Sequence, residues 1–255
     1  MGGPAEFRVV IPARYDSTRL PGKPLLLLAG RPMIEWVYQR ACRSSARQVL
    51  IATDDVRILE AARAWGAQAI MTDAAHASGT DRIAEVARLQ GWSASEIVVN
   101  VQGDEPLLPE ALIDQVAALL ISSPQAQLAT LSVPIGAPDE MRDPNVVKVV
   151  SDLSQRALYF SRAPIPWDRE AGAGAGTLAQ RHLGIYAYRV GALLQLAAQP
   201  PAPLERLEKL EQLRALEHGM DIRVAEAVAT PGGDVNAAGD IERVEALLVS
   251  ERFRL

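Results

Sequence analysis

Short apolar runs alternate with amphipathic stretches through the first half of the chain. Strands buried on both faces, as in parallel sheets, are predicted where β-branched residues cluster: Phe7–Pro12, Val49–Thr53 and Ile97–Gln102. The intervening and following stretches are long enough for crossover helices: Pro32–Ala46, Val56–Trp65, Thr80–Leu89 and a helix after Pro109. This alternation predicts a doubly wound, mostly parallel α/β sheet with right-handed crossovers.

The pattern changes from about residue 128 onward. Strands without full helices between them are predicted at Leu128–Ile135, Val146–Val150, Ala157–Phe160 and Leu183–Tyr188. The end of the chain predicts a helix Leu204–His218 closed by Gly219, a strand Ile222–Val228 and a helix Ile241–Arg252. We expect a single domain over residues 1–255, with residues 128–190 as a smaller mixed-sheet extension. Gly172–Gly176 is expected to be a loop tip in it.

Charge and composition exclude several classes of protein. The 255 residues carry 26 Lys and Arg against 31 Asp and Glu, a net charge of −5, so the basic footprint of a nucleic-acid or membrane-surface binder is missing. Apolar runs are too short to span a membrane and the first residues do not resemble a signal peptide, so we expect a cytoplasmic protein. The single cysteine, Cys42, excludes internal disulfides and is expected to be a buried helix residue.

A cationic loop directly follows the first predicted strand. It carries Arg14, Arg19 and Lys23 together with glycine and hydroxyl residues, at the strand end where open α/β sheets bind ligands. Guanidinium and ammonium groups bind phosphate oxygens, so the loop is a candidate polyphosphate site. It is not a Walker A loop, because Pro24 follows the lysine. A solvated polar loop explains the same segment equally well.

The strand Ile97–Gln102 leads into Gly103-Asp104-Glu105. A carboxylate at a strand end suits a divalent cation that also binds substrate phosphates, and Asp104 is the better candidate ligand. The alternative is a strand-ending Asx turn.

Two further segments allow a binding or a structural interpretation. Ser78-Gly79-Thr80 enters a helix, with Thr80 as the expected N-cap, and its free N–H groups could bind an anion or a base edge. Plain helix capping is the equal alternative. In the helix expected at Leu204–His218, leucines form the core side and a polar row suits a sugar: Glu205, Glu208 and Gln212. A solvated face explains that row better.

Several motifs together resemble the 3-deoxy-manno-octulosonate cytidylyltransferase family over nearly the whole chain. They occur in the family's order: Val10–Arg14, Ser17–Pro24, Ser78–Thr80, Asn100–Pro106, Tyr159–Arg162, Ile165–Asp168, His182–Tyr186 and Leu210–Arg214. The resemblance implies a nucleotide-diphospho-sugar transferase type of α/β fold and a homodimer. It implies the reaction of CTP with the acidic sugar 3-deoxy-manno-octulosonate (Kdo), with Mg²⁺, to give CMP-Kdo and pyrophosphate for lipopolysaccharide synthesis.

The resemblance also implies roles for individual residues. Arg14, Arg19 and Lys23 would hold the triphosphate, Ser78, Gly79 and Thr80 would frame the cytidine, and Asp104 would bind magnesium. The sugar pocket would be lined by Gln102, Arg162, His182, Tyr186, Glu208 and Gln212.

One position departs from the family pattern. The family carries an aspartate ligand to the metal near its end, and Asn236 stands there in this chain. An amide oxygen can bind Mg²⁺ but brings no charge. We therefore expect Asn236 as the second ligand, with nearby Asp234 as the rival.

Other functions remain open on the sequence alone. A cytidylyltransferase for another acidic sugar, such as sialic acid, would share these motifs, and Asn236 allows a non-catalytic nucleotide-binding relative. A metal-dependent glycosyltransferase would need an Asp-x-Asp motif, which Gly103-Asp104-Glu105 does not supply.

Overall fold

The computed structural model describes residues 6–16, 20–169, 179–235 and 237–250. Arg19, Asn236 and the Gly172–Gly176 segment, all named above, lie outside these ranges.

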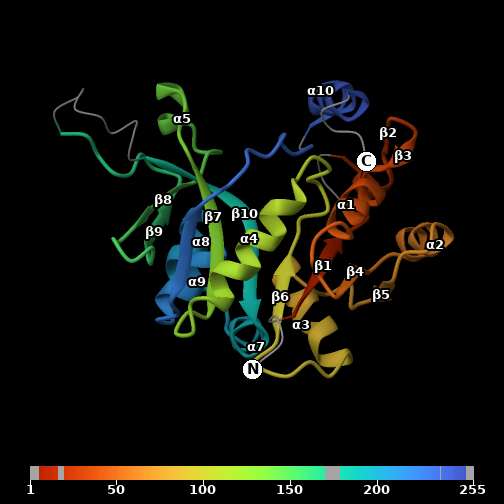
Figure 1. Ribbon diagram of the computed structural model, residues 1–255, viewed down its shortest axis with the longest axis horizontal. Helices are drawn as coiled ribbons and strands as arrows, with labels where there is room; N and C mark the ends of the chain where they lie inside the picture. The colour runs from red at the N-terminus through yellow and green to blue at the C-terminus, as the bar shows by residue number, and fades with distance from the viewer. Residues whose placement is uncertain (1–5, 17–19, 170–178, 236, 251–255) are drawn as a thin grey trace.

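A twisted sheet forms the centre of the molecule (Figure 1). The strands of its main path run, in spatial order, β11 (Ile222–Glu226), β7 (Leu128–Pro134), β10 (Gln180–Arg189), β6 (Ile97–Asn100), β1 (Phe7–Ala13), β4 (Gln48–Thr53) and β5 (Ala69–Met71). The strands from β6 to β5 are parallel to one another, as are β11 and β7, while β10 is antiparallel to both of its neighbours. The prediction of a mostly parallel α/β sheet is confirmed.

Helices cover both faces of the sheet. One face packs against α1 (Met33–Ala41), α2 (Val56–Ala64) and α4 (Glu110–Ile121), and the other against α3 (Gly79–Leu89), α7 (Val190–Ala198) and α9 (Gln212–Glu217). The strand residues alternate accordingly: Val9 and Ile11 of β1 join the first core, and Val10 joins the second. Because both faces are buried, the strands are continuously apolar, which explains why they could be recognised from the sequence.

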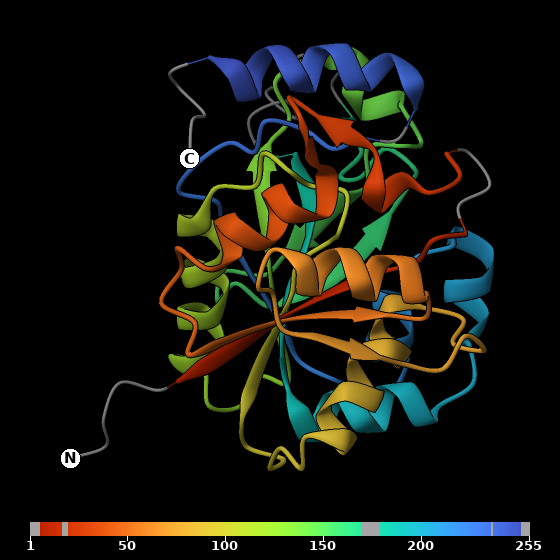
Figure 2. The same cartoon turned by 90° about the vertical axis from the view of Figure 1, so that its right-hand side faces the viewer.

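A third, smaller core lies at the edge where the strands β1 and β6 end. The short strands β2 (Leu27–Leu28) and β3 (Arg31–Pro32) form a hairpin there, and α10 (Ala238–Val249) lies over it (Figure 2). Leu28 and Val244 are fully buried in this contact, and Glu245 accepts a hydrogen bond from the Ala29 N–H at 2.8 Å. The helix α10 therefore covers the region that follows the first strand.

The segment 128–190 is divided between the main sheet and a small projection. Its strands β7 and β10 lie within the main sheet, and only β8 (Lys148–Ser151) and β9 (Ala157–Ser161) branch from it through β10. The short helix α5 (Pro138–Arg142) precedes this branch. The mixed pairing was predicted, but the place of β7 and β10 within the main sheet was not.

The prediction of one helix over Leu204–His218 is wrong. The structure has α8 (Pro203–Glu208) and α9, separated at Lys209, whose φ of 54° is left-handed. Leu204 and Leu207 are exposed, whereas the later leucines of the stripe, Leu210 and Leu213, are buried. The break turns α9 onto the sheet, so only the second half of the leucine stripe reaches the core. Gly219 ends α9 with a φ of 74°, as predicted.

Two smaller predictions also fail. Cys42 is exposed, because it follows the last turn of α1 instead of facing the sheet. The N-cap of α3 is Ser78, not Thr80: the Ser78 hydroxyl accepts from the Asp81 N–H, and the Asp81 carboxylate accepts from the Ser78 N–H in a capping box.

Candidate active site

The predicted phosphate loop folds back on itself at the end of β1. Gly22 has a φ of 69° and donates its N–H to the Tyr15 carbonyl at 3.0 Å, which closes the loop. The Tyr15 ring covers Gly22 so closely that a Cβ there would lie 3.1 Å from the ring. Arg57 of α2 also lies over this ring, with its guanidinium carbon 3.3 Å from the ring centroid. These contacts fix the base of the loop and direct Lys23 toward the sheet.

A cavity of about 370 Å³, called the loop cavity here, opens between this loop and the end of β6. Its lining residues are Pro12, Ala13, Arg14, Asp16, Lys23, Pro24, Met33, Gln102, Gly103 and Asp104. Lys23 Nζ lies 2.6 Å from Asp104 Oδ2. The structure thus brings together Arg14, Lys23 and Asp104, three of the residues singled out in the sequence.

Gly103 explains why Asp104 reaches the loop. A Cβ on Gly103 would lie 2.8 Å from the Pro12 carbonyl oxygen, so a larger residue would push the segment after β6 away from β1. Close contact between the two strand ends is what sets the Asp104 carboxylate beside Lys23.

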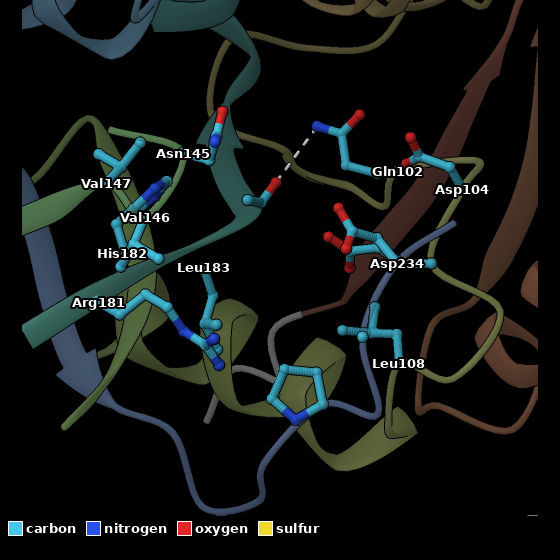
Figure 3. Close-up of a pocket in the computed structure, with 14 residues that line it drawn as sticks. Gln102, Asp104, Leu108, Asn145, Val146, Val147, Arg181, His182, Leu183 and Asp234 are labelled. Carbon is cyan, nitrogen blue, oxygen red and sulfur yellow. Dashed lines mark hydrogen bonds between the residues drawn. The ribbon is translucent and has the colours of Figure 1, made fainter. Parts of the chain in front are cut away.

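A larger cavity of about 520 Å³, the central cavity, lies on the other side of Asp104. It is lined by Gln102, Asp104, Glu105, Leu108, Asn145, Val146, Val147, Arg181, His182, Leu183, Gly184, Pro231, Gly233 and Asp234 (Figure 3). The Val235 N–H donates to the Asp104 carbonyl at 3.1 Å, which joins the segment before α10 to this wall. Burial, together with the charges of Asp104 and Asp234, raises the pKa of Glu105 to about 8.

A third cavity of about 220 Å³, the side cavity, extends from Gln102 and His182 toward α9. Its lining residues are Asn100, Gln102, Leu128, His182, Gly184, Tyr186, Tyr188, Leu196, Leu210, Glu211 and Gln212. Four of the six predicted sugar-site residues meet here: Gln102, His182, Tyr186 and Gln212. Gln102 lines all three cavities, and its side chain donates to the Gly184 carbonyl at 3.3 Å.

His182 is held as a neutral ring. Burial lowers its pKa to about 3, so the ring carries no charge at neutral pH. Its Nε2 lies 2.9 Å from the Thr130 hydroxyl oxygen, and that hydroxyl lies 2.7 Å from the Ile185 carbonyl. Because the hydroxyl has one proton, which it donates to the carbonyl, His182 Nε2 is the donor and Nδ1 is left as an acceptor. The ring can therefore accept a hydrogen bond from a sugar hydroxyl.

Ser78 and Thr80 contact a carboxylate that was not predicted as a site residue. The Ser78 hydroxyl donates to Glu211 Oε1 at 2.9 Å and the Thr80 hydroxyl to Oε2 at 2.7 Å. Gly79 lies between them against Pro12, where a Cβ would be 3.2 Å from the proline ring. Glu211 thus links the start of α3 to the side cavity. It adjoins Gln212 within a motif quoted above, but no pattern in the sequence singled it out.

Arg162 and Glu208 do not line any of these three cavities. The Glu208 carboxylate accepts from the Ser161 hydroxyl at 2.6 Å and from the Arg162 N–H at 2.9 Å. The Arg162 guanidinium donates to the carbonyls of Pro144 and Glu208, both at 2.7 Å, and of Lys209 at 3.5 Å. The hydrogen bonds of these two residues connect the end of β9 to α8. Their contact with a sugar stays a prediction.

Comparisons with known proteins identify the family. A family model described as Cytidylyltransferase matches residues 8–222. The chain belongs to the cytidylyltransferase family. The 3-deoxy-manno-octulosonate cytidylyltransferase of Pseudomonas fluorescens is 55% identical over 248 residues, 95% of this chain and 98% of that protein. The one from Thioalkalivibrio sulfidiphilus is 54% identical over 246 residues, again 95% and 98% of the two chains.

Solved cytidylyltransferase structures agree with this assignment. A CMP:2-keto-3-deoxy-manno-octonic acid synthetase in complex with CTP has a TM-score of 0.88 and 42% identity, covering 95% of this chain and 98% of its own. A cytidylyltransferase from Leptospira borgpetersenii shares the fold, with a TM-score of 0.62 at 16% identity, covering 97% of this chain and 90% of its own. The resemblance drawn from the ordered motifs is therefore confirmed.

Proposed function

We propose that this cytidylyltransferase joins CTP and Kdo to give CMP-Kdo and pyrophosphate, and that the product supplies Kdo for lipopolysaccharide. The observation that carries the proposal is the junction formed by Gln102 and Asp104, which line both the loop cavity and the central cavity. On one side lie the cations Arg14 and Lys23, which suit a triphosphate. On the other side the lining is rich in carboxylates and amides, which suit a sugar with many hydroxyls.

The chemistry is an in-line displacement. The anomeric hydroxyl oxygen of the sugar forms a bond to the α-phosphorus, the bond from that phosphorus to the bridging oxygen of pyrophosphate breaks, and the hydroxyl proton is lost. Most of the rate comes from alignment of the two substrates and from neutralisation of phosphate charge, which Arg14 and Lys23 supply. His182 orients the sugar as a neutral acceptor and does not act as an acid, because its pKa of about 3 leaves the ring without the second, acidic proton of an imidazolium at neutral pH.

We expect Mg²⁺ as the cofactor, with Asp104 as its anionic ligand. The donor set supports this: Asp104 already faces a cation, the Lys23 ammonium, and Asp234 lines the same cavity. Within the described ranges, no group of three or more His, Cys, Asp or Glu side chains could hold a metal. Mg²⁺ commonly uses one or two carboxylates and completes its shell with water and phosphates. When bound, it would neutralise phosphate charge and lower the pKa of the attacking hydroxyl.

Pyrophosphate release from each nucleoside triphosphate, with Kdo or with sialic acid, tests the function. We expect release only with CTP and Kdo. Good release with sialic acid and none with Kdo would reassign the substrate, and no release with any pair would favour a non-catalytic nucleotide-binding protein. A homodimer in the cytoplasm, with no nucleic-acid or membrane partner, remains our expectation. None of the described helices combines the length and the apolar character that a membrane span requires.

A magnesium titration of activity tests the metal ligands. Asp104→Asn should lower kcat at least a hundredfold, because the metal loses its anionic ligand as charge develops on the phosphates. Asn236→Asp should lower the Mg²⁺ concentration needed for half-maximal activity by a few fold, since substrate phosphates supply most of the charge. The control is Asp139→Asn on the exposed α5. If Asp234→Ala strongly lowered activity and Asn236→Asp left the Mg²⁺ dependence unchanged, Asp234 would be the second ligand.

A further inference from the structure

The central cavity contains an arginine, Arg181, whose side chain has no hydrogen-bond or ion-pair partner in the described part of the chain. Arg181 projects from β10 into this cavity, toward the wall that carries Leu108 and Asp234 (Figure 3). Among the described residues, none forms a hydrogen bond or an ion pair with its guanidinium group. A guanidinium has five N–H donors in a planar fork, so Arg181 offers an open binding site for an anion.

Two other cations, on the β8–β9 side of the cavity, already have hydrogen-bond partners. The Arg162 guanidinium donates to three backbone carbonyls, as described above. Lys148 is fully buried, and its ammonium donates to the carbonyls of Asp143, Val146 and Arg162 at 2.6–2.9 Å. Both groups hold the backbone around the cavity, which leaves Arg181 available to a ligand.

The charges of the cavity define what kind of anion Arg181 can accept. Asp104 and Asp234 line the same cavity, so a second phosphate chain with several negative charges would be repelled. The phosphate-binding cations, Arg14 and Lys23, line the loop cavity instead. A sugar acid combines one negative charge with many hydroxyls. Its hydroxyls can donate to the carboxylates and to the amide oxygens of Gln102 and Asn145, and its carboxylate can accept from a guanidinium.

We propose that Arg181 binds the carboxylate of the sugar substrate in a bidentate pair and thereby selects an acidic sugar over a neutral one. The proposal rests on the function proposed above and assigns the carboxylate contact to a residue outside the predicted sugar pocket. The shared lining residues Gln102 and Asp104 set the bound sugar next to the loop cavity, where its hydroxyl can meet the nucleotide.

Steady-state kinetics of Arg181→Gln and Arg181→Lys test this assignment. Arg181→Gln should raise KM for Kdo at least tenfold and leave KM for CTP within twofold, because the loop cavity is untouched. Arg181→Lys should raise KM for Kdo less than Arg181→Gln does, since lysine keeps the positive charge but lacks the paired N–H donors of a guanidinium. The matched control is Arg63→Gln, which removes an exposed arginine on α2 and should leave both values unchanged. An unchanged KM for Kdo in Arg181→Gln would overturn the proposal.

Comparison of Kdo with its methyl ester identifies the group that Arg181 contacts. The wild-type protein should bind the acid more tightly than the uncharged ester, measured as competition of each against labelled Kdo, and Arg181→Gln should bind the two alike. If Arg181→Gln keeps the preference and Arg162→Gln loses it, Arg162 holds the carboxylate and the proposal fails. The wild-type reaction with Kdo is measured in the same series, so failure of the proposed function would appear there independently of Arg181.

Discussion

At the scale of single residues, the site depends on groups whose ionisation is set by burial. His182 faces Thr130, and it packs between the rings of Phe160 and Tyr186 at centroid distances of 5.1 and 5.2 Å. These neighbours supply no negative charge that would stabilise an imidazolium, and desolvation alone lowers its pKa to about 3. The ring is therefore a fixed acceptor, and the fold must keep it neutral.

This neutrality predicts how stability depends on pH. In the unfolded chain His182 takes up a proton near its ordinary pKa of 6.5, whereas the folded protein takes it up only near pH 3. Stability is therefore complete above pH 6.5 and is lost as the pH falls toward 3. Urea unfolding at pH 7.5 and pH 5 should show that wild type loses about 1–2 kcal/mol more than His182→Gln between the two values. Equal losses would mean that the folded protein can protonate this ring.

The candidate site was predictable where its residues follow a strand. Arg14, Lys23 and Asp104 follow β1 and β6, and parallel strand ends meet at one edge of a sheet, so their proximity could be inferred from the order of the chain. The positions of Arg162 and Glu208 could not, because backbone carbonyls and N–H groups compete for both side chains. Residue type alone does not reveal which arginine will be left without a protein partner.

At the scale of elements, periodicity located the buried central strands and the amphipathic helices between them. Periodicity failed at Lys209, because the leucines keep their helical spacing through the break and the pattern therefore does not reveal it. In the structure the break exposes Leu207 and reorients α9. The apolar helix α7, which follows β10, was also not predicted. The path of β10 between β6 and β7 is set by pairing across distant segments, which local patterns do not encode.

Lys148 illustrates how one element shapes the cavity wall. Its side chain leaves β8 and joins the loop after α5 to the end of β9 through three backbone carbonyls. Lys148→Met should lower the free energy of unfolding by about 3 kcal/mol, because three partly buried carbonyl acceptors lose a charged donor at once. It should also raise KM for Kdo more than KM for CTP, since Val146 and Val147 line the central cavity. Urea unfolding and the pyrophosphate assay measure the two effects. An unchanged unfolding free energy would contradict the role given to this ammonium.

At the scale of the whole molecule, the three cavities meet at one edge of the sheet. Gln102 lines all of them, so the loop cavity, the central cavity and the side cavity next to α9 converge on the end of β6. α10 covers the same edge and connects to it through Val235. The amino-terminal and carboxy-terminal parts of the chain therefore build the site together, although the fold brings them from opposite ends of the sequence.

The exposed apolar side chains of the β8–β9 projection predict a homodimer. Leu153 is fully exposed between the two strands, Leu158 on β9 is 53% exposed, and Trp167 beyond it is 80% exposed. Apolar side chains presented on a branch outside the main cores favour a self-complementary contact with a second copy, and stable contacts bury about 800 Å² per partner. Sedimentation at micromolar concentration should therefore give about twice the chain mass of 27.5 kDa.

Leu158→Asp tests whether this projection forms the contact. A carboxylate placed in an apolar interface must lose its hydration without gaining a partner, so the variant should sediment near 27.5 kDa, the mass of one chain. The matched control is Leu89→Asp, because Leu89 is similarly exposed, at 59%, but lies at the end of α3, outside the β8–β9 projection. It should sediment like the wild type. Dissociation by Leu89→Asp and not by Leu158→Asp would move the interface to α3, and a wild-type protein with the mass of one chain would refute the dimer itself.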